Sequence, residues 1–193
     1  MVDPNPPQPS DSELLDRSRG GDMGAFRQLV ERFHGRLLAT ATGMLGPGAD
    51  AEEVVQETLI RFYRSLQRFE GRSALGTYLT RITMNEAVKA INRKKRWNMR
   101  FLSRDDPDKP LVDPVQELRD APIEQAERIA SIRNAVQSLK PEFRSVVVLR
   151  FLNEYSTLEC SRILGIPPGT VMSRLSRALD KLSPTLKNLH ENA

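Results

Sequence analysis

The segment from residue 103 to residue 122, "SRDDPDKPLVDPVQELRDAP", constrains the fold of this chain more than any other part of its sequence. It contains four prolines and five aspartates but few apolar residues. Proline removes a backbone donor and fixes φ, and aspartate favours turns, so this composition disfavours both a long helix and a central strand. We therefore expect residues 101–122 to be a flexible, acidic, proline-rich linker between two folded domains.

Both stretches beside this linker have apolar residues at helical spacing. In residues 12–100 and again in residues 123–184, apolar side chains recur at intervals of three and four, as they do along one face of an α-helix. Nowhere does the sequence alternate polar and apolar residues as a half-buried strand does. The sequence thus predicts an all-α protein with two small helical domains, a disordered N-terminal tail at residues 1–11 and a C-terminal tail at residues 185–193.

Several helix starts are visible as capping patterns. Ser156 followed by Glu159 has the spacing of a capping box, in which the two side chains satisfy free backbone amides at a helix start. Asp50 followed by Glu53 has a similar spacing, and it predicts a helix start at Asp50. Pro168 suits a first helical turn, because its missing amide proton has no partner to lose there.

The stretch after Ser156 has the layout of a helix-turn-helix. A short helix, "STLECSRIL", is followed by the turn "GIPP" and then by a second helix. At 100° per residue the second helix has a buried stripe of Val171, Leu175, Ala178 and Leu182, with Leu179 beside it. The remaining surface carries short hydroxyls and arginines, which can approach base edges and phosphates closely. From these residues alone, an αα-hairpin that only packs a core stays open as the alternative.

Two segments of the first domain have unusual charge patterns. "DAEEVVQETLIRFYRSLQRFE" gathers acids at one end and arginines at the other, which fits either a docking surface for a basic partner or an ordinary solvated face. "GRSALGTYLTRITMNEAVKAINRKKRW" combines a tyrosine ring, an asparagine and many cations, as a track for single-stranded nucleic acid does. Its alternatives are a half-buried ring for Tyr78 and, for "RKKRW", a cluster that only complements the helix dipole.

Charge is unevenly distributed between the first domain and the linker. Residues 12–100 contain 16 lysines and arginines against 10 acids, whereas residues 101–125 contain 3 against 7. Cationic side chains therefore concentrate on a folded domain, where they can meet a polyanion. The acidic linker is either a mimic of nucleic acid or a solvated spacer.

These motifs together resemble the bacterial sigma factors of the extracytoplasmic-function type, over residues 12–100 and 123–184. "DAEEVVQET" resembles their region two, and "LKPEFRSVVVLRFLNEYSTLECSRILGIPPGTVMSRLSRALDKL" resembles their region four. Three departures are visible. Met172 stands where a lysine is usual, Tyr78 where a tryptophan is common, and Cys160 with Ser161 where the family has an Ile-Ala pair.

The resemblance implies three binding surfaces. Contact with the coiled coil of the polymerase clamp is implied for Asp50, Glu53, Gln56 and Glu57. Melting and capture of the −10 promoter strand is implied for Arg72, Ser73, Tyr78, Arg81, Asn85, Lys89, Arg93, Lys94, Lys95 and Arg96. Contact with the −35 element is implied for Thr170, Ser173, Arg174 and Arg177.

The sequence also predicts what this protein lacks. It has one cysteine and two distant histidines, and no catalytic triad, P-loop or metal-ligand spacing, so we expect no enzymatic activity, metal or cofactor. Cys160 is expected to be a small core residue rather than a redox switch. There is no signal peptide or membrane span, which predicts a cytoplasmic protein.

The expected partners follow from the resemblance. They are core RNA polymerase, promoter DNA and an anti-sigma factor, with a chain that is monomeric when free of them. Two other functions remain open. One is a sigma-like decoy that binds an anti-sigma factor without supporting transcription, and the other is a stand-alone helix-turn-helix regulator.

Overall fold

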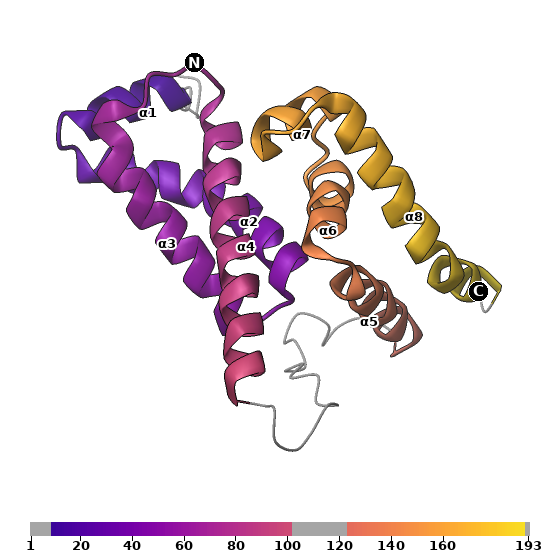
Figure 1. Ribbon diagram of the computed structural model, residues 1–193. Helices are drawn as coiled ribbons and strands as arrows, with labels where there is room; N and C mark the ends of the chain where they lie inside the picture. Colours follow the sequence, from indigo (N-terminus) through magenta and orange to yellow (C-terminus); the bar gives the residue numbers. More distant parts are fainter. Residues whose placement is uncertain (1–8, 102–122, 192–193) are drawn as a thin grey trace, which may run out of the picture.

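The computed structural model describes residues 9–101 and 123–191, and every regular element in these two ranges is helical (Figure 1). This confirms the all-α prediction. The first range contains α1 (Asp11–Arg19), α2 (Met23–Leu45), α3 (Ala49–Ser65), the 3-10 turn η1 (Leu66–Arg68) and α4 (Leu75–Phe101). The second contains α5 (Ile123–Ser138), α6 (Pro141–Val147), the π-helical turn η3 (Val148–Leu152), α7 (Thr157–Leu164) and α8 (Pro168–Glu191).

The predicted domain boundaries need two corrections. Ser10 caps α1 and Asp11 begins it, so the ordered part of the first domain starts inside the predicted N-terminal tail. At the other end, α8 continues through Pro184 to Glu191, so the predicted C-terminal tail is mostly helix. Proline removes only one backbone donor there, and the helix continues past it. The predicted linker lies outside the described residues apart from Phe101, which ends α4.

The capping predictions had different outcomes. The Ser156 hydroxyl accepts a bond from the Glu159 amide, and the Glu159 carboxylate accepts one from the Ser156 amide, which confirms the capping box of α7. The predicted start at Asp50 is wrong, because α3 begins one residue earlier behind Gly48 and has no side-chain cap. The Asp50 carboxylate instead forms an ion pair with Lys94 of α4, at 2.9 Å.

Helices α1 to α4 surround a core of their own. Leu14 of α1, Leu29 of α2, Phe62 of α3 and Leu79 of α4 each have at most 1% of their surface exposed, and they belong to one apolar cluster. Burying a side chain of this size stabilises the fold by roughly 1.5–3 kcal/mol relative to leaving it exposed. The long α2 and α4 lie in the middle of the molecule and contact both regions of the chain (Figure 1).

The second region packs directly against the first, which the linker did not predict. Val148 and Leu149 of η3, Cys160 of α7 and Val171 of α8 belong to the same apolar cluster as the core of α1 to α4. On α2, Gly43 forms the notch that receives η3. A Cβ atom at this position would lie 2.8 Å from Leu152 Cδ1 and 3.0 Å from Val148 Cγ2. A glycine is therefore needed for this close approach.

Polar groups also join the two regions. The hydroxyls of Thr80 on α4 and Tyr155 before α7 lie 2.9 Å apart and are both buried. The Asn153 amide donates to the Thr40 hydroxyl at 2.9 Å, linking η3 to α2. Buried polar groups that lack a partner cost free energy, so these bonds specify one arrangement of the two regions.

Arg144 of α6 makes the most extensive of these contacts. The residue is 9% exposed, and its guanidinium donates to the carbonyls of Met44 and Leu139 and to both the side chain and the backbone carbonyl of Gln137. Burial lowers the pKa of Arg144 from its ordinary value. The free carbonyls at the end of α2 attract a cation, since a helix C-terminus carries partial negative charge.

Candidate nucleic-acid interface

Helices α7 and α8 form a helix-turn-helix with a defined turn. Gly165 follows α7 in the left-handed region, at φ 65°, and its amide donates to the Ser161 carbonyl. The Ser161 hydroxyl donates to the Ile166 carbonyl at 2.6 Å. Helix α8 then begins at Pro168, as expected, and the amides of Thr170 and Val171 in its first turn donate to the Pro167 carbonyl. This first turn is the part of a recognition helix that meets DNA.

The expected buried stripe of α8 is mostly confirmed. Val171, Ala178 and Leu182 are at most 6% exposed, and Leu175 packs against them while partly buried. Leu179, predicted to lie beside the stripe, is 37% exposed. Its angle around the helix puts it at the edge of the packed face, where no neighbouring helix covers it fully.

The predicted −35 readers of α8 do not all face the same way. Ser173 and Arg177 are exposed to solvent, while Thr170 is half-buried near the helix start. Arg174 is also half-buried, and it lines a cleft between α8 and the first region. Of the predicted −35 readers, Ser173 and Arg177 therefore lie on the solvent-facing surface of α8, whereas Arg174 faces inward.

This cleft has a volume of about 1070 Å³ and runs between the two regions of the chain. Its wall on the first region includes three residues predicted to contact the −10 strand, namely Tyr78, Asn85 and Lys89. Arg174 and residues of α6 and α7 form the opposite wall. Residues expected to contact two separate promoter elements thus line one cleft.

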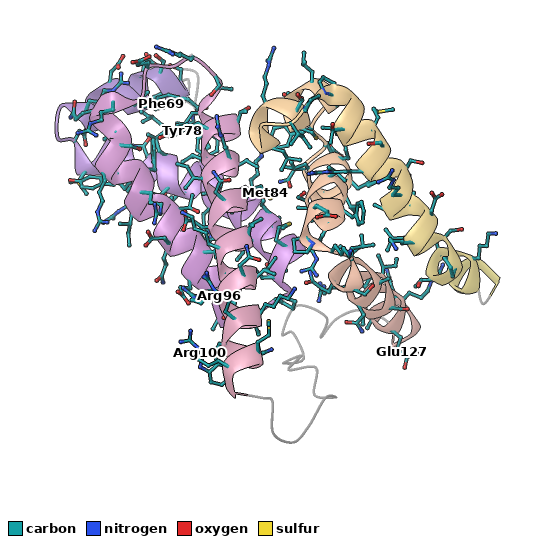
Figure 2. All side chains as sticks on the ribbon, in the orientation of Figure 1. Phe69, Tyr78, Met84, Arg96, Arg100 and Glu127 are labelled. Atoms are coloured by element: carbon teal, nitrogen blue, oxygen red, sulfur yellow. The ribbon has the colours of Figure 1, made fainter. Side chains whose placement is uncertain are left out.

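Tyr78 is held by aromatic neighbours at the top of α4. Its ring centroid lies 4.8 Å from that of Phe69 and 6.5 Å from that of Phe62, and its hydroxyl lies 3.0 Å from the Ser65 hydroxyl. Figure 2 shows Tyr78 beside Phe69, far from Arg96 and Arg100 at the other end of the helix. The half-buried position fits the packing alternative, and Tyr78 also lines the cleft.

The other predicted −10 contacts form an exposed cationic surface. It begins with Arg72 and Ser73 in the loop before α4 and continues along α4 through Arg81, Asn85, Lys89, Arg93, Lys94, Lys95 and Arg96, all exposed. The 18 residue steps from Tyr78 to Arg96 span about 27 Å at 1.5 Å per residue. This surface is long enough to follow several nucleotides of a single strand.

Two of the four predicted polymerase contacts on α3 form ion pairs with this cationic surface. Glu53 forms an ion pair with Arg93 at 2.9 Å, as Asp50 does with Lys94. Gln56 is exposed, and Glu57 pairs with Arg61 at 2.8 Å. Exposed ion pairs contribute only about 0.2–1 kcal/mol to stability. These acids and cations can therefore break their ion pairs at low cost and bind partners in other molecules.

Comparison with known proteins decides the family. The family model for sigma-70 region 2 matches residues 29–97, and the model for sigma-70 region 4 matches residues 129–182. The sigma-E factor of Haemophilus influenzae is 30% identical over 189 residues, which cover 94% of this chain and 98% of that protein. The chain belongs to the extracytoplasmic-function sigma factors.

Other relatives also match most of the chain. The sigma factor SigM of Mycobacterium tuberculosis is 32% identical, with 94% of this chain and 87% of that protein covered, and SigW of Bacillus subtilis is 30% identical, with 91% and 96% covered. Sigma factors are transcription initiation factors without enzymatic activity, which confirms that this chain is not an enzyme.

Solved structures show the same fold in related proteins. CnrH, in complex with the cytosolic domain of CnrY, matches with a TM-score of 0.63 and 26% identity over 91% of this chain and 96% of that one. RpoE of Bartonella quintana, in complex with the anti-sigma factor NepR, matches with a TM-score of 0.68 and 24% identity over 84% and 96%. In the part of this sigma factor that the structure describes, no helix is long and apolar enough to cross a membrane.

Sequence reasoning missed several cleft residues of this sigma factor. Arg61, Arg64 and Arg68 of α3 and η1 line the cleft beside Tyr78, and Arg61 also pairs with Glu86 of α4 at 3.2 Å. These arginines are spaced by three and four residues, so the sequence could have shown that they share one helical face. Cys160 is fully buried, and burial raises the pKa of its thiol, which confirms its role as a core residue.

Proposed function

We propose that this sigma factor binds core RNA polymerase through Asp50, Glu53, Gln56 and Glu57 and directs it to promoters in the cytoplasm. The observation that carries this proposal is the presence, in one chain, of both a region 2 match and a region 4 match, each with an exposed basic surface. A stand-alone regulator needs only the helix-turn-helix, and a decoy needs neither DNA-binding surface.

On this proposal the two regions contact different parts of the promoter. The exposed surface from Arg72 to Arg96 binds the melted −10 strand, with Asn85 available to hydrogen-bond a base and the lysines and arginines following the phosphates. Thr170, Ser173, Arg174 and Arg177 contact the −35 duplex. The polymerase carries out the chemistry of transcription.

This function requires the two regions to move apart. Two elements about 25 base pairs apart are separated by about 85 Å along B-form DNA, at 3.4 Å per base pair. Arg174 and Lys89 line one cleft of about 1070 Å³. In this arrangement Lys89 therefore cannot contact the −10 strand while Arg174 contacts the −35 element. We therefore propose that the packed arrangement belongs to the free protein and opens on the polymerase.

An anti-sigma factor is the proposed regulator. The support comes from related sigma factors, since one of the matching structures contains a sigma factor bound to an anti-sigma factor. Such a partner would act by holding a conformation that cannot reach both promoter elements.

Reconstituted transcription tests the main proposal. The full chain is added to core polymerase from the same organism, and open complexes are measured on promoters selected from its own genome. Triple replacement of Glu53, Gln56 and Glu57 by alanine is expected to weaken polymerase binding, whereas Glu52→Ala, an exposed acid on the same helix, serves as the matched control.

Three outcomes separate the candidates. Initiation by the wild-type chain that is lost in the α3 triple variant supports the sigma factor. Tight specific binding to duplex DNA without polymerase would favour a stand-alone regulator. A chain that binds an anti-sigma factor but binds neither polymerase nor DNA would favour the decoy.

A further inference from the structure

Two large apolar side chains are exposed where the helix-turn-helix meets solvent. Met172 on α8 is 56% exposed and Leu158 on α7 is 54% exposed. The Thr157 hydroxyl lies 3.6 Å from Met172 Sδ, so the start of α7 and this methionine are in contact. Leu158 follows Thr157 directly in the chain and is itself exposed.

Met172 occupies a position from which a base can be reached. It is the fifth residue of α8, next to the exposed Ser173 and one turn before the exposed Ser176. In a helix-turn-helix, the N-terminal residues of the second helix contact base edges in the major groove. The surface around Met172 is polar, with two exposed polar residues beside the methionine. We therefore take DNA, rather than another apolar surface, as the partner of this part of α8.

The chemistry of the methionine side chain narrows what it can recognise. Its thioether has no donor and accepts hydrogen bonds only weakly, so it contributes little to contact with phosphates or polar base edges. The apolar feature of the major groove is the C5-methyl group of thymine. A flexible, unbranched apolar chain can adjust to such a methyl group.

We propose that Met172, supported by Leu158, reads the methyl group of a thymine in the −35 element. The inference rests on the proposed function, because it assumes that α8 enters promoter DNA. A lysine at this position would add a phosphate contact that is independent of sequence, whereas Met172 adds a contact that depends on the base. Compared with a lysine, Met172 therefore gives up salt-sensitive affinity for phosphate and adds selectivity for a base.

Deoxyuridine tests this proposal directly, because it keeps every hydrogen-bonding group of thymine and lacks only the methyl. The polymerase assembled with the full chain is measured on its selected promoter duplex, in which each thymine of the −35 element is replaced in turn. We expect one position at which deoxyuridine weakens binding about four-fold, the effect of losing one buried methyl group.

Variants of Met172 assign that effect to the side chain. Met172→Ala is expected to bind thymine and deoxyuridine equally well at that position. Met172→Lys is expected to lose the same discrimination while the slope of log affinity against log salt steepens by about 0.9, the value for one added phosphate contact. Leu158→Ala is expected to reduce the discrimination without abolishing it.

Leu186→Ala is the matched control, because Leu186 is a 43% exposed apolar residue on the same helix. It lies 14 residues further along α8, about 21 Å from Met172. This variant is expected to retain the four-fold preference for thymine. Unchanged thermal unfolding of each variant shows that the fold is intact.

Several results would overturn the proposal. Equal binding of thymine and deoxyuridine duplexes by the wild-type complex, or a −35 element without thymine, excludes methyl reading. A preference that persists in Met172→Lys assigns it to another residue. Weaker polymerase binding by Met172→Ala, with the thymine preference unchanged, shows that a protein covers this surface. If no promoter is selected at all, the proposed function itself fails.

Discussion

The two regions of this sigma factor bury their apolar residues differently. Those of the first region belong to one cluster, which includes 19 of its buried residues, in α1 to α4, η1 and the loop after η1. The second region divides its buried residues between this cluster, to which it contributes seven, and a smaller cluster of five that is its own. The first region has a complete core, whereas the second depends on its neighbour, as expected of a segment of about 60 residues.

Truncating the shared core should have the largest effect. Leu149→Ala removes a fully buried side chain of η3 and is expected to lower the free energy of unfolding by about 2–5 kcal/mol. Leu182→Ala, in the smaller cluster and 6% exposed, is expected to lower it by less, because the site can relax toward solvent. Urea unfolding measures both. An equal or larger loss for Leu182→Ala would contradict the difference between the clusters.

A wedge at the α2 notch separates the two regions without truncating either core. Gly43→Glu places side-chain atoms where Val148 and Leu152 lie, and it is expected to cost about 1–3 kcal/mol. Hydrogen exchange should become faster at Val146 to Leu149 and stay unchanged in α3.

Gly35→Glu provides the control for this wedge. Gly35 lies on the same helix, and no heavy atom lies within 4 Å of the position of its added Cβ. Equal exchange in the two variants would mean that the second region holds its structure without α2.

The buried hydroxyl pair tests the polar part of the interface. Tyr155→Phe leaves the Thr80 hydroxyl buried without this partner, and it is expected to cost about 1–3 kcal/mol. Tyr63→Phe is the matched control, because Tyr63 is 51% exposed. A double-mutant cycle with Thr80→Val isolates the pair. A coupling energy near zero would show that the hydroxyls do not hold the regions together.

Removing either of the two capping boxes should have the smallest effect on stability. Because each box lies in a different region, the two changes show whether the regions unfold separately. Ser156→Ala is expected to cost about 1 kcal/mol by uncapping α7. Bonds from the side chain and backbone of Ser156 hold the pKa of Glu159 below its ordinary value of 4.5. The stabilisation is therefore present above pH 4.5 and is lost as pH falls through the lowered pKa.

Acid titration checks this sign. The protection factors of the α7 amides, which compare exchange with the intrinsic rate at the same pH, should fall as the pH drops below 4.5, and Ser156→Ala should remove that dependence. Ser10→Ala makes the same change at the start of α1, where hydrogen bonds from Ser10 also lower the pKa of Glu13. Loss of protection in α7 when only Ser10 is changed would show that the two regions unfold as one unit.

Local patterns predicted much of this fold and of the candidate site. Helical spacing and capping depend on residues a few positions apart, so the helices, the start of α7 and the buried stripe of α8 could be inferred from sequence. The start of α3 could not, because the carboxylate of Asp50 bonds to a lysine 44 residues away rather than to its own helix.

The contact between the regions was also beyond sequence reasoning. Gly43 looks like an ordinary helical glycine, and Arg144 like one of many surface cations, until η3 and the end of α2 are brought together. The acidic linker indicates two domains, but it carries no information on whether they touch. The inward orientation of Arg174 follows from that packing, and it could not be predicted from the angle of the residue around α8.

The bond between Arg144 and the end of α2 has a consequence for the newly made protein. Arg144 is synthesised 100 residues after Met44, whose carbonyl it binds. At about 5–20 residues per second, roughly 5–20 s pass between the two. During this interval water must hydrate the last carbonyls of α2, and the Gly43 notch is uncovered. A nascent chain therefore presents its first region, with the α4 surface open, before the second region exists to face it.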